Sequence, residues 1–181
     1  MPPTLAVREL RADDIPRIAD YWLGSAPAHL TGMGVDLAKV PDRAGWTAML
    51  TQQLNTPLPE KQSYCLIWEV DGRAVGHCNI NQIRPGEQAY MHLHLWNAPG
   101  RRQGLGRQLV RLALPRFFAA YALQRLYCEP YALNPAPNHA LAQLGFRFVR
   151  EHVCTPGSLN FEQPVKLWEL RREDLERLGL A

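Results

Sequence analysis

The chain has 181 residues, of which 46% are hydrophobic and 20% are charged, and its net charge is +3. This composition is typical of a globular protein with a buried core and argues against a disordered chain. The net charge is too small, and the basic residues too dispersed, for a surface that follows a nucleic-acid backbone. The N-terminus has no apolar signal core, and no stretch approaches the ~20 apolar residues of a membrane span. We therefore expect one domain over residues 1–181 that is cytoplasmic and contacts neither nucleic acid nor membrane.

The cysteines indicate free thiols rather than disulfides. Each stands alone within an apolar stretch, and none belongs to a C-x-x-C pair. Isolated cysteines of this kind are usually buried and reduced in cytosolic proteins. The residues concerned are Cys65, Cys78, Cys128 and Cys154.

The first half of the chain predicts a strand, a helical region and a hairpin. Alternation of apolar and polar residues indicates a strand near the N-terminus, and Ala12-Asp13-Asp14 supplies a helix start just after it. Asp71-Gly72 between two alternating segments is a strong hairpin signal. The expected elements are a strand (4–10), a helix (12–23), a loop with a short helix (24–42), a helix (46–54) and two hairpin strands (63–70 and 73–80).

The centre of the chain combines a strand, a glycine-rich turn and a helix, which are expected at residues 90–96, 97–106 and 107 to about 120. Apolar Met91, Leu93 and Leu95 alternate with the other side chains of the strand, which is the period of a half-buried strand. The first amides of a helix lack partners within it and lie at its positive end. A strand, a glycine turn with arginines and a helix therefore favour binding of a phosphate group.

Two common phosphate-binding motifs are excluded at this turn. The Walker motif needs Lys and then Ser or Thr after its second glycine, whereas Arg107 and Gln108 follow Gly106. The dinucleotide motif needs three spaced glycines and an acidic residue after the next strand, and neither is present. The R-x-x-G-x-G pattern at residues 101–106 resembles the acyl-CoA pyrophosphate loop of the GNAT superfamily of N-acyltransferases. The resemblance implies that the pyrophosphate is bound by Arg101, Arg102, Gln103, Gly104, Leu105, Gly106 and Arg107.

A second block downstream supports this resemblance. A strand that begins at Leu126 and continues through residues 129–133 is followed by Asn134 and by a helix that begins at Pro137 or Asn138. Gly145 and Phe146 then complete a pattern similar to the N-x-x-[SA]-x-x-x-x-x-x-x-G-F block of the superfamily. The resemblance covers residues 4–170 and is closest to the branch of ribosomal-protein N-terminal acetyltransferases. It implies that Asn134 and Asn138 contribute to CoA binding.

The resemblance implies an α/β (α+β) GNAT fold, with a mixed, strongly twisted sheet and helices on both faces. The last expected elements, strands at 146–153 and 165–170 and a short polar helix from 171, fit this fold. In the superfamily the strands that end here at Trp96 and Leu133 splay apart, and acyl-CoA lies between them, its pantetheine pairing like an added strand. Backbone amides near Leu95 and Trp96 are the usual oxyanion donors. Acetyl-CoA is the expected co-substrate, and no metal is expected.

The predicted chemistry requires a proton acceptor, because an amine that attacks a thioester must be neutral. His92 and His94 share one face of the central strand, opposite a purely apolar face, which indicates that their face borders a wet cavity. Histidine titrates near neutral pH and therefore suits a general base. The alternative is that both are hydrogen-bonded structural residues. Two histidines do not make a zinc site, and the sequence places no third ligand beside them.

Glu129 and Tyr131 are the other catalytic candidates. Glu129 is expected near the end of the second splayed strand, where it would hold the substrate ammonium or act as base with a raised pKa. Its alternative is an ion pair with an arginine. Tyr131 is a candidate acid for the departing thiolate, and packing is its alternative. Many superfamily members carry a tyrosine seven residues after the motif asparagine as this acid, but Leu141 stands there in this chain.

We therefore expect transfer of an acetyl group from acetyl-CoA to a primary amine, by direct attack in a ternary complex. The acceptor is either a small-molecule amine or an N-terminal amine. Leu141 leaves open a non-catalytic acyl-CoA-binding or regulatory module, and transfer of a longer acyl group is a third alternative. Dimers are common in the branch that the chain resembles, so a homodimer is one expectation for the oligomeric state.

Overall fold

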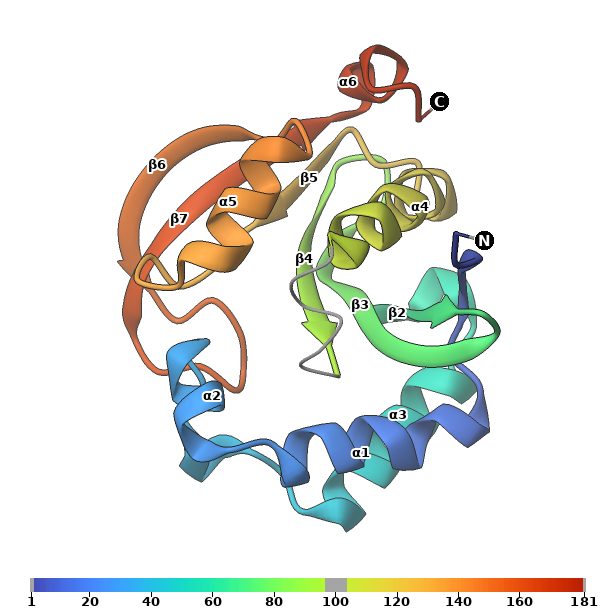
Figure 1. Cartoon of the computed structure of the whole chain (residues 1–181), viewed down its shortest axis with the longest axis vertical. Helices are drawn as coiled ribbons and strands as arrows, with labels where there is room; N and C mark the ends of the chain where they lie inside the picture. The colour runs from blue at the N-terminus through green and yellow to red at the C-terminus, as the bar shows by residue number, and fades with distance from the viewer. Residues whose placement is uncertain (1, 97–103, 181) are drawn as a thin grey trace.

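The computed structural model of the chain (Figure 1) describes residues 2–96 and 104–180. Its strands form a seven-stranded sheet in the order β1-β2-β3-β4-β5-β7-β6. Each neighbouring pair is antiparallel except β4 and β5, which are parallel, so the sheet is mixed as expected. The strands are β1 (Leu5–Glu9), β2 (Ser63–Val70), β3 (Arg73–Arg84), β4 (Gln88–Leu95), β5 (Arg125–Cys128), β6 (Arg147–Cys154) and β7 (Gln163–Arg171).

Helices cover both faces of the sheet, because β2 and its neighbours bury side chains on both sides. Leu66 and Trp68 of β2 join the core beneath α4, whereas Cys65 and Ile67 of the same strand join the core beneath α1 and α3. Figure 1 shows α4 on one side of the sheet and α1 with α3 on the other. The α-helices are α1 (Ile15–Gly24), α2 (Pro27–Gly32), α3 (Arg43–Asn55), α4 (Leu105–Ala120), α5 (Pro135–Gln143) and α6 (Arg172–Arg177).

The two parallel strands at the centre of the sheet separate after a short contact. Residues Gln88–Tyr90 of β4 pair with Arg125–Tyr127 of β5, and the pairing ends there. Figure 1 shows β4 and β5 diverging from this point, with an opening between them. The splayed central strands that the sequence predicts are thus confirmed.

Several element boundaries differ from those that the sequence predicts. The predicted continuation of β5 through residues 129–133 is wrong, because β5 ends at Cys128. Beyond Cys128, an isolated β-bridge joins Tyr131 to Val165 of β7. Pro130, which has no amide hydrogen, stands just after the end of the strand. Helix α5 begins at Pro135, earlier than predicted, because proline is well suited to the first turn of a helix.

The segment after α2 is hydrogen-bonded to the connection between β6 and β7 and to the start of β7. Gly34 accepts hydrogen bonds at its carbonyl oxygen from Asn160 Nδ2 and Gln163 Nε2, both at 2.9 Å. Val35 forms an isolated bridge with Asn160. Gly34 has a φ of +82°, and a Cβ there would lie 1.8 Å from Gln163 Oε1, so this contact requires glycine. Parts of the chain far apart in sequence thereby form one continuous wall beside the opening.

Cys65, Cys78 and Cys128 are buried and Cys154 is half-buried, and all four are free thiols, as the sequence predicts. Among the helices of the described residues, none combines the length and the apolar character needed to cross a membrane.

Candidate active site

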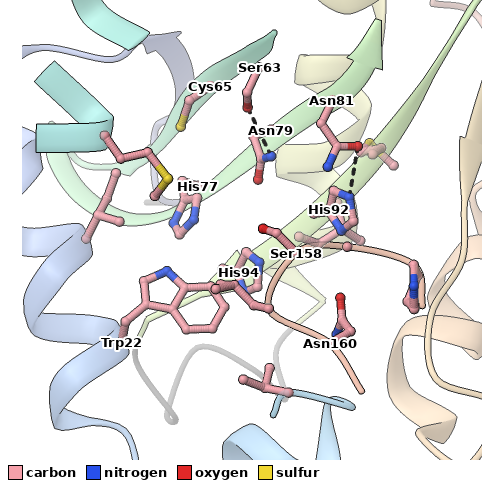
Figure 2. Close-up of a pocket in the computed structure, with 18 of the residues that line it drawn as sticks. Trp22, Ser63, Cys65, His77, Asn79, Asn81, His92, His94, Ser158 and Asn160 are labelled. Atoms are coloured by element: carbon pink, nitrogen blue, oxygen red, sulfur yellow. Dashed lines mark hydrogen bonds between the residues drawn. The ribbon is translucent and has the colours of Figure 1, made fainter. Parts of the chain in front are cut away.

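A cavity of about 880 Å³ lies where β4 and β5 separate. One wall is the face of β3 and β4 that carries His92 and His94, and α1 and α3 supply Trp22 and Trp46. The segment after β5 contributes further side chains, and the connection between β6 and β7 closes the remaining side. Figure 2 shows the imidazoles and the polar side chains of β3 projecting from these strands, with Trp22 beside them.

The wall of β3 and β4 is a ladder of polar groups. Across the two strands His77 pairs with His94, and Asn79 pairs with His92. The opposite face of the same strands carries Cys78, Ile80 and Met91, which are buried in the core beneath α4. His92 and His94 line the cavity, as the alternation of the strand predicts. No sequence motif indicates His77, although it stands at an alternate position of the predicted hairpin strand.

His92 is held as a neutral imidazole. Its Nε2–H donates to Asn81 Oδ1 at 3.2 Å, which leaves Nδ1 as the unprotonated nitrogen. Burial lowers the pKa of His92 to about 4. A group with this pKa is present in its basic form at neutral pH but gives up an accepted proton readily. His92 is therefore a weak proton sink.

His94 lies among aromatic rings at the junction of β4 and α1. Its Nδ1 is 3.4 Å from the hydroxyl oxygen of Tyr21, which is also 3.4 Å from Nε2 of His29. Its ring stacks on His77 at 4.8 Å between centroids and lies 4.8 Å from the ring of Trp22. The hydroxyl of Tyr21 thus connects His94 with His29, a half-buried residue of α2. This chain of groups is formed by tertiary packing, and no sequence motif indicates it.

Trp96 holds the end of β4 against β3. Its indole Nε1–H donates to His77 Nδ1 at 2.8 Å, and its backbone amide donates to Val75 O at 2.8 Å. Because the Trp96 amide is bonded to Val75, it is not directed at an acyl group in this structure. To donate to an oxyanion as predicted, the Trp96 amide would have to leave its bond to Val75. Burial lowers the pKa of His77 to about 3, so this imidazole is neutral.

Glu129 lies just after β5 and lines the cavity. Burial raises its pKa, an effect that the nearby His152 partly offsets. The ion-pair partner is His152, whose Nε2 is 3.1 Å from Oε1, rather than an arginine. Cys154 Sγ is 4.0 Å from Oε2, and the ligand-type atoms of the three residues lie within 4.8 Å of one another. The sequence did not predict this cluster, because β6 supplies two of its members.

Tyr131, Asn134 and Asn138 form a connected group at the start of α5. Tyr131 and Asn134 line the cavity, and Asn134 is the N-cap residue of α5. Asn138 is buried, and its Nδ2 donates to Tyr131 O at 3.0 Å and to Asn134 O at 2.7 Å. Its Oδ1 accepts from Trp168 Nε1 at 2.9 Å. The Asn138 amide therefore holds the segment between β5 and α5 in place.

Leu141 is fully buried in the core beneath α4 and α5, so this position does not supply a group that protonates sulfur.

The predicted pyrophosphate loop falls partly outside the described residues, which exclude Arg101, Arg102 and Gln103. Gly104 has a φ of +71° and is the N-cap of α4, and no side chain of the described residues caps this helix end. A Cβ on Gly106 would meet no atom of residues 2–96 or 104–180 within 4 Å outside its own helix turn, so these residues leave space beside the first turn. Leu105 is the first helical residue, and the side chain of Arg107 donates to Gln143 of α5. An uncapped helix start with free space beside it fits an anionic group.

The comparison with protein families assigns the fold. Residues 35–146, more than half of the chain, match the model of the Acetyltransferase (GNAT) family. The chain belongs to this family. Among curated proteins none matches the sequence significantly.

Solved structures of GNAT proteins share the fold at low sequence identity. RimJ of Mycobacterium smegmatis in complex with CoA-disulfide has a TM-score of 0.77 and 17% identity, covering 94% of this chain and 83% of RimJ. The ribosomal-protein-S5-alanine acetyltransferase of Vibrio fischeri has a TM-score of 0.77 and 18% identity, covering 96% and 98%. Spermidine N-acetyltransferase of Vibrio cholerae, in complex with CoA and spermine, has a TM-score of 0.76 and 15% identity, covering 93% and 96%. The predicted GNAT fold is thus confirmed.

Proposed function

We propose that this GNAT protein transfers an acetyl group from acetyl-CoA to a primary amine, by direct attack in a ternary complex, and that residues 1–181 act as one domain. The observation that carries the proposal is the divergence of β4 from β5 beside the uncapped start of α4, with His94 on the cavity wall. This arrangement offers an anion site, an open strand edge and a proton acceptor in one place.

Acetyl-CoA fits the opening in two respects. The start of α4 at Gly104 suits the pyrophosphate, and Arg101, Arg102, Gln103 and Arg107 supply charge and donors around it. The part of β4 beyond Tyr90 is not paired with β5, so the pantetheine arm has room to lie along β4 near Leu95. Asn134, and the segment that Asn138 holds, border the other side. The RimJ structure is a complex with CoA-disulfide and the spermidine acetyltransferase structure is a complex with CoA and spermine, which supports this co-substrate.

His94 is the proposed general base. It takes a proton from the acceptor ammonium, either directly or through a water, and the neutral amine then attacks the thioester carbonyl. A C–N bond forms as the C–S bond breaks. The hydroxyl of Tyr21 contacts Nδ1 of His94 and leads to His29, which gives the accepted proton a route away from the cavity. His92 is the less suitable base because its pKa is about 4.

Tyr131 is the proposed acid for the departing thiolate, because it lines the cavity on the β5 side and Leu141 has no proton to give. Glu129, whose pKa is raised by burial, is the proposed site for the acceptor ammonium. The negative charge of its ionised form attracts the ammonium and orients the amine for attack. The neighbouring acetyltransferases are named for a ribosomal-protein alanine and for spermidine, which supports an amine acceptor in general.

Titration calorimetry with acetyl-CoA, followed by assay of free thiol with a panel of amines, tests this proposal. We expect binding, and release of free CoA when an amine is present. Binding without release for any amine would favour the acyl-CoA-binding module that Leu141 leaves open. Faster reaction with longer acyl-CoA esters would favour the longer acyl group. Sedimentation analysis of the same sample tests the homodimer, which stays a prediction.

A further inference from the structure

We propose that the acceptor is a primary monoamine built on an aromatic ring, and that the cavity discriminates against polyamines and aminoglycosides. This inference rests on the acetyltransferase function proposed above and names the chemical class of its acceptor. Three features of the cavity favour such an acceptor: the charges that line it, its aromatic wall and two amide atoms that have no hydrogen-bond partner among the described residues.

The cavity has little negative charge. Its charged lining residues are Lys39, Glu60, Lys61 and Glu129. Lys39 and Glu60 are exposed at the rim, and Lys39 is 3.8 Å from Asp36. Lys61 donates to the carbonyl oxygen of Gln53. Within the described part of the chain, Glu129 is thus the one carboxylate that lines the interior of the cavity.

The segment outside the described residues cannot alter this balance toward negative charge. Residues 97–103 read N-A-P-G-R-R-Q, which includes two arginines and no acidic side chain. A polyamine carries several ammonium groups, and each one that leaves water without a carboxylate partner is costly. One interior carboxylate matches an acceptor with one ammonium group.

One wall of the cavity is aromatic. Trp22 stacks on Trp46 with 5.2 Å between ring centroids and 16° between planes. Trp22 also lies beside His94, which in turn stacks on His77. Figure 2 shows Trp22, His77 and His94 grouped on one side of the space. Such a wall suits contact with an aromatic ring of the acceptor, whereas the ammonium group is left to Glu129.

Two amide atoms on β3 are available to a neutral polar group. Asn79 uses Nδ2 to donate to Ser63 Oγ at 3.4 Å, and Asn81 uses Oδ1 to accept from His92. Within the described residues, Asn79 Oδ1 and Asn81 Nδ2 have no hydrogen-bond partner. They offer one acceptor and one donor to a hydroxyl or a ring N–H of the substrate.

The first test compares acceptors with the full-length protein and acetyl-CoA. We expect kcat/KM for tyramine and tryptamine to exceed that for spermidine and kanamycin by roughly tenfold or more, since one unpaired charge is worth at least that factor. A higher kcat/KM for spermidine or kanamycin would overturn this inference and leave the proposed function intact. Failure to acetylate any amine would overturn the proposed function and this inference together.

The second test adds a carboxylate to the cavity wall. Asn79→Asp keeps the size of the side chain, and we expect it to raise the ratio of kcat/KM for spermidine to that for tyramine roughly tenfold. Asn55→Asp is the matched control, because Asn55 is exposed on α3 and is not a lining residue. An unchanged ratio in Asn79→Asp, with thermal unfolding showing a folded protein, would contradict the proposed role of the neutral wall.

Discussion

His77 on β3 and His94 on β4 are cross-strand partners whose rings stack at 4.8 Å between centroids and 23° between planes. Trp96 donates its indole N–H to His77 Nδ1, so the tautomer of His77 is fixed with its proton on Nε2. A neutral His77 places no positive charge beside His94, which favours the proposed role of His94 as proton acceptor.

The roles of the cavity histidines predict unequal effects of their removal. His94→Ala should lower kcat roughly 10²-fold, the usual loss for a general base. His92→Ala should have a smaller effect, because His92 bonds to Asn81 and its pKa is about 4. Steady-state kinetics with acetyl-CoA and a reactive amine measure both values. If neither variant loses activity, Glu129 becomes the better candidate for the base.

The buried histidines predict a loss of stability on acidification. The pKa of His77 is lowered to about 3 and that of His92 to about 4, so the unfolded chain binds more protons than the native protein between pH 6.5 and these values. Stability should therefore fall as the pH falls through this range, by at most about 1.4 kcal/mol per pH unit for each histidine.

Urea unfolding at a series of pH values measures this dependence. His92→Gln should flatten the fall of stability below pH 6.5. His139→Gln, a change at an exposed residue of α5, should leave the curve as it is in the parent protein. Parallel curves for the parent and His92→Gln would show that His92 is protonated in the native state as easily as in the unfolded chain.

The start of α4 predicts a charge-specific loss of CoA binding. Gly104→Glu should abolish binding of acetyl-CoA, because it places a negative charge where the pyrophosphate is expected. Gly104→Ala is the matched control: it introduces the same strain of a side chain at a φ of +71° without the charge. Calorimetry should show much weaker binding for the glutamate than for the alanine. Equal affinities for the two variants would argue against the pyrophosphate assignment.

The contact between Gly34 and Gln163 predicts that a single methyl group added at position 34 lowers the stability of the protein strongly. Gly34→Ala should destabilise the protein by about 2–4 kcal/mol, from an unfavourable φ and from overlap with the Gln163 side chain. Gly72→Ala provides the comparison, because Gly72 has a φ of +72° and no atom within 4 Å of a Cβ. Denaturant unfolding should show a clearly smaller loss for Gly72→Ala. Similar losses would mean that Gln163 moves aside without cost.

The fold and one wall of the cavity were predictable because they depend on local patterns. The alternation over residues 90–96 placed His92 and His94 on a common face, and the two motifs in their order indicated the GNAT fold. The predicted hairpin strand at 73–80 carries His77 and Asn79 at alternate positions, so this part of the ladder could be inferred from the hairpin, whereas Asn81 lies one residue beyond that strand. The end of β5 at Cys128 was harder to predict, because residues 129–133 are apolar enough for a strand.

Contacts between distant parts of the chain were not predictable from local patterns. The pairing of Glu129 with His152 depends on how β6 lies in the sheet, and the contact of Tyr21 with His94 depends on how α1 packs. Neither partner carries a motif. Asn138 illustrates the same limit, because its side-chain amide accepts a hydrogen bond from Trp168 of β7, which is distant in sequence.

The attachment of Gly34 to Asn160 and Gln163 has a consequence for biosynthesis. On the ribosome, α1 to α5 emerge before the residues that complete the cavity and before β7, which flanks β5. A nascent chain that has exposed His94 and Glu129 therefore still lacks one side of the pocket and β7, the neighbour of β5 on the side away from β4. The cavity is completed only by the last fifth of the polypeptide, so a prematurely terminated product would carry these side chains without the enclosure around them.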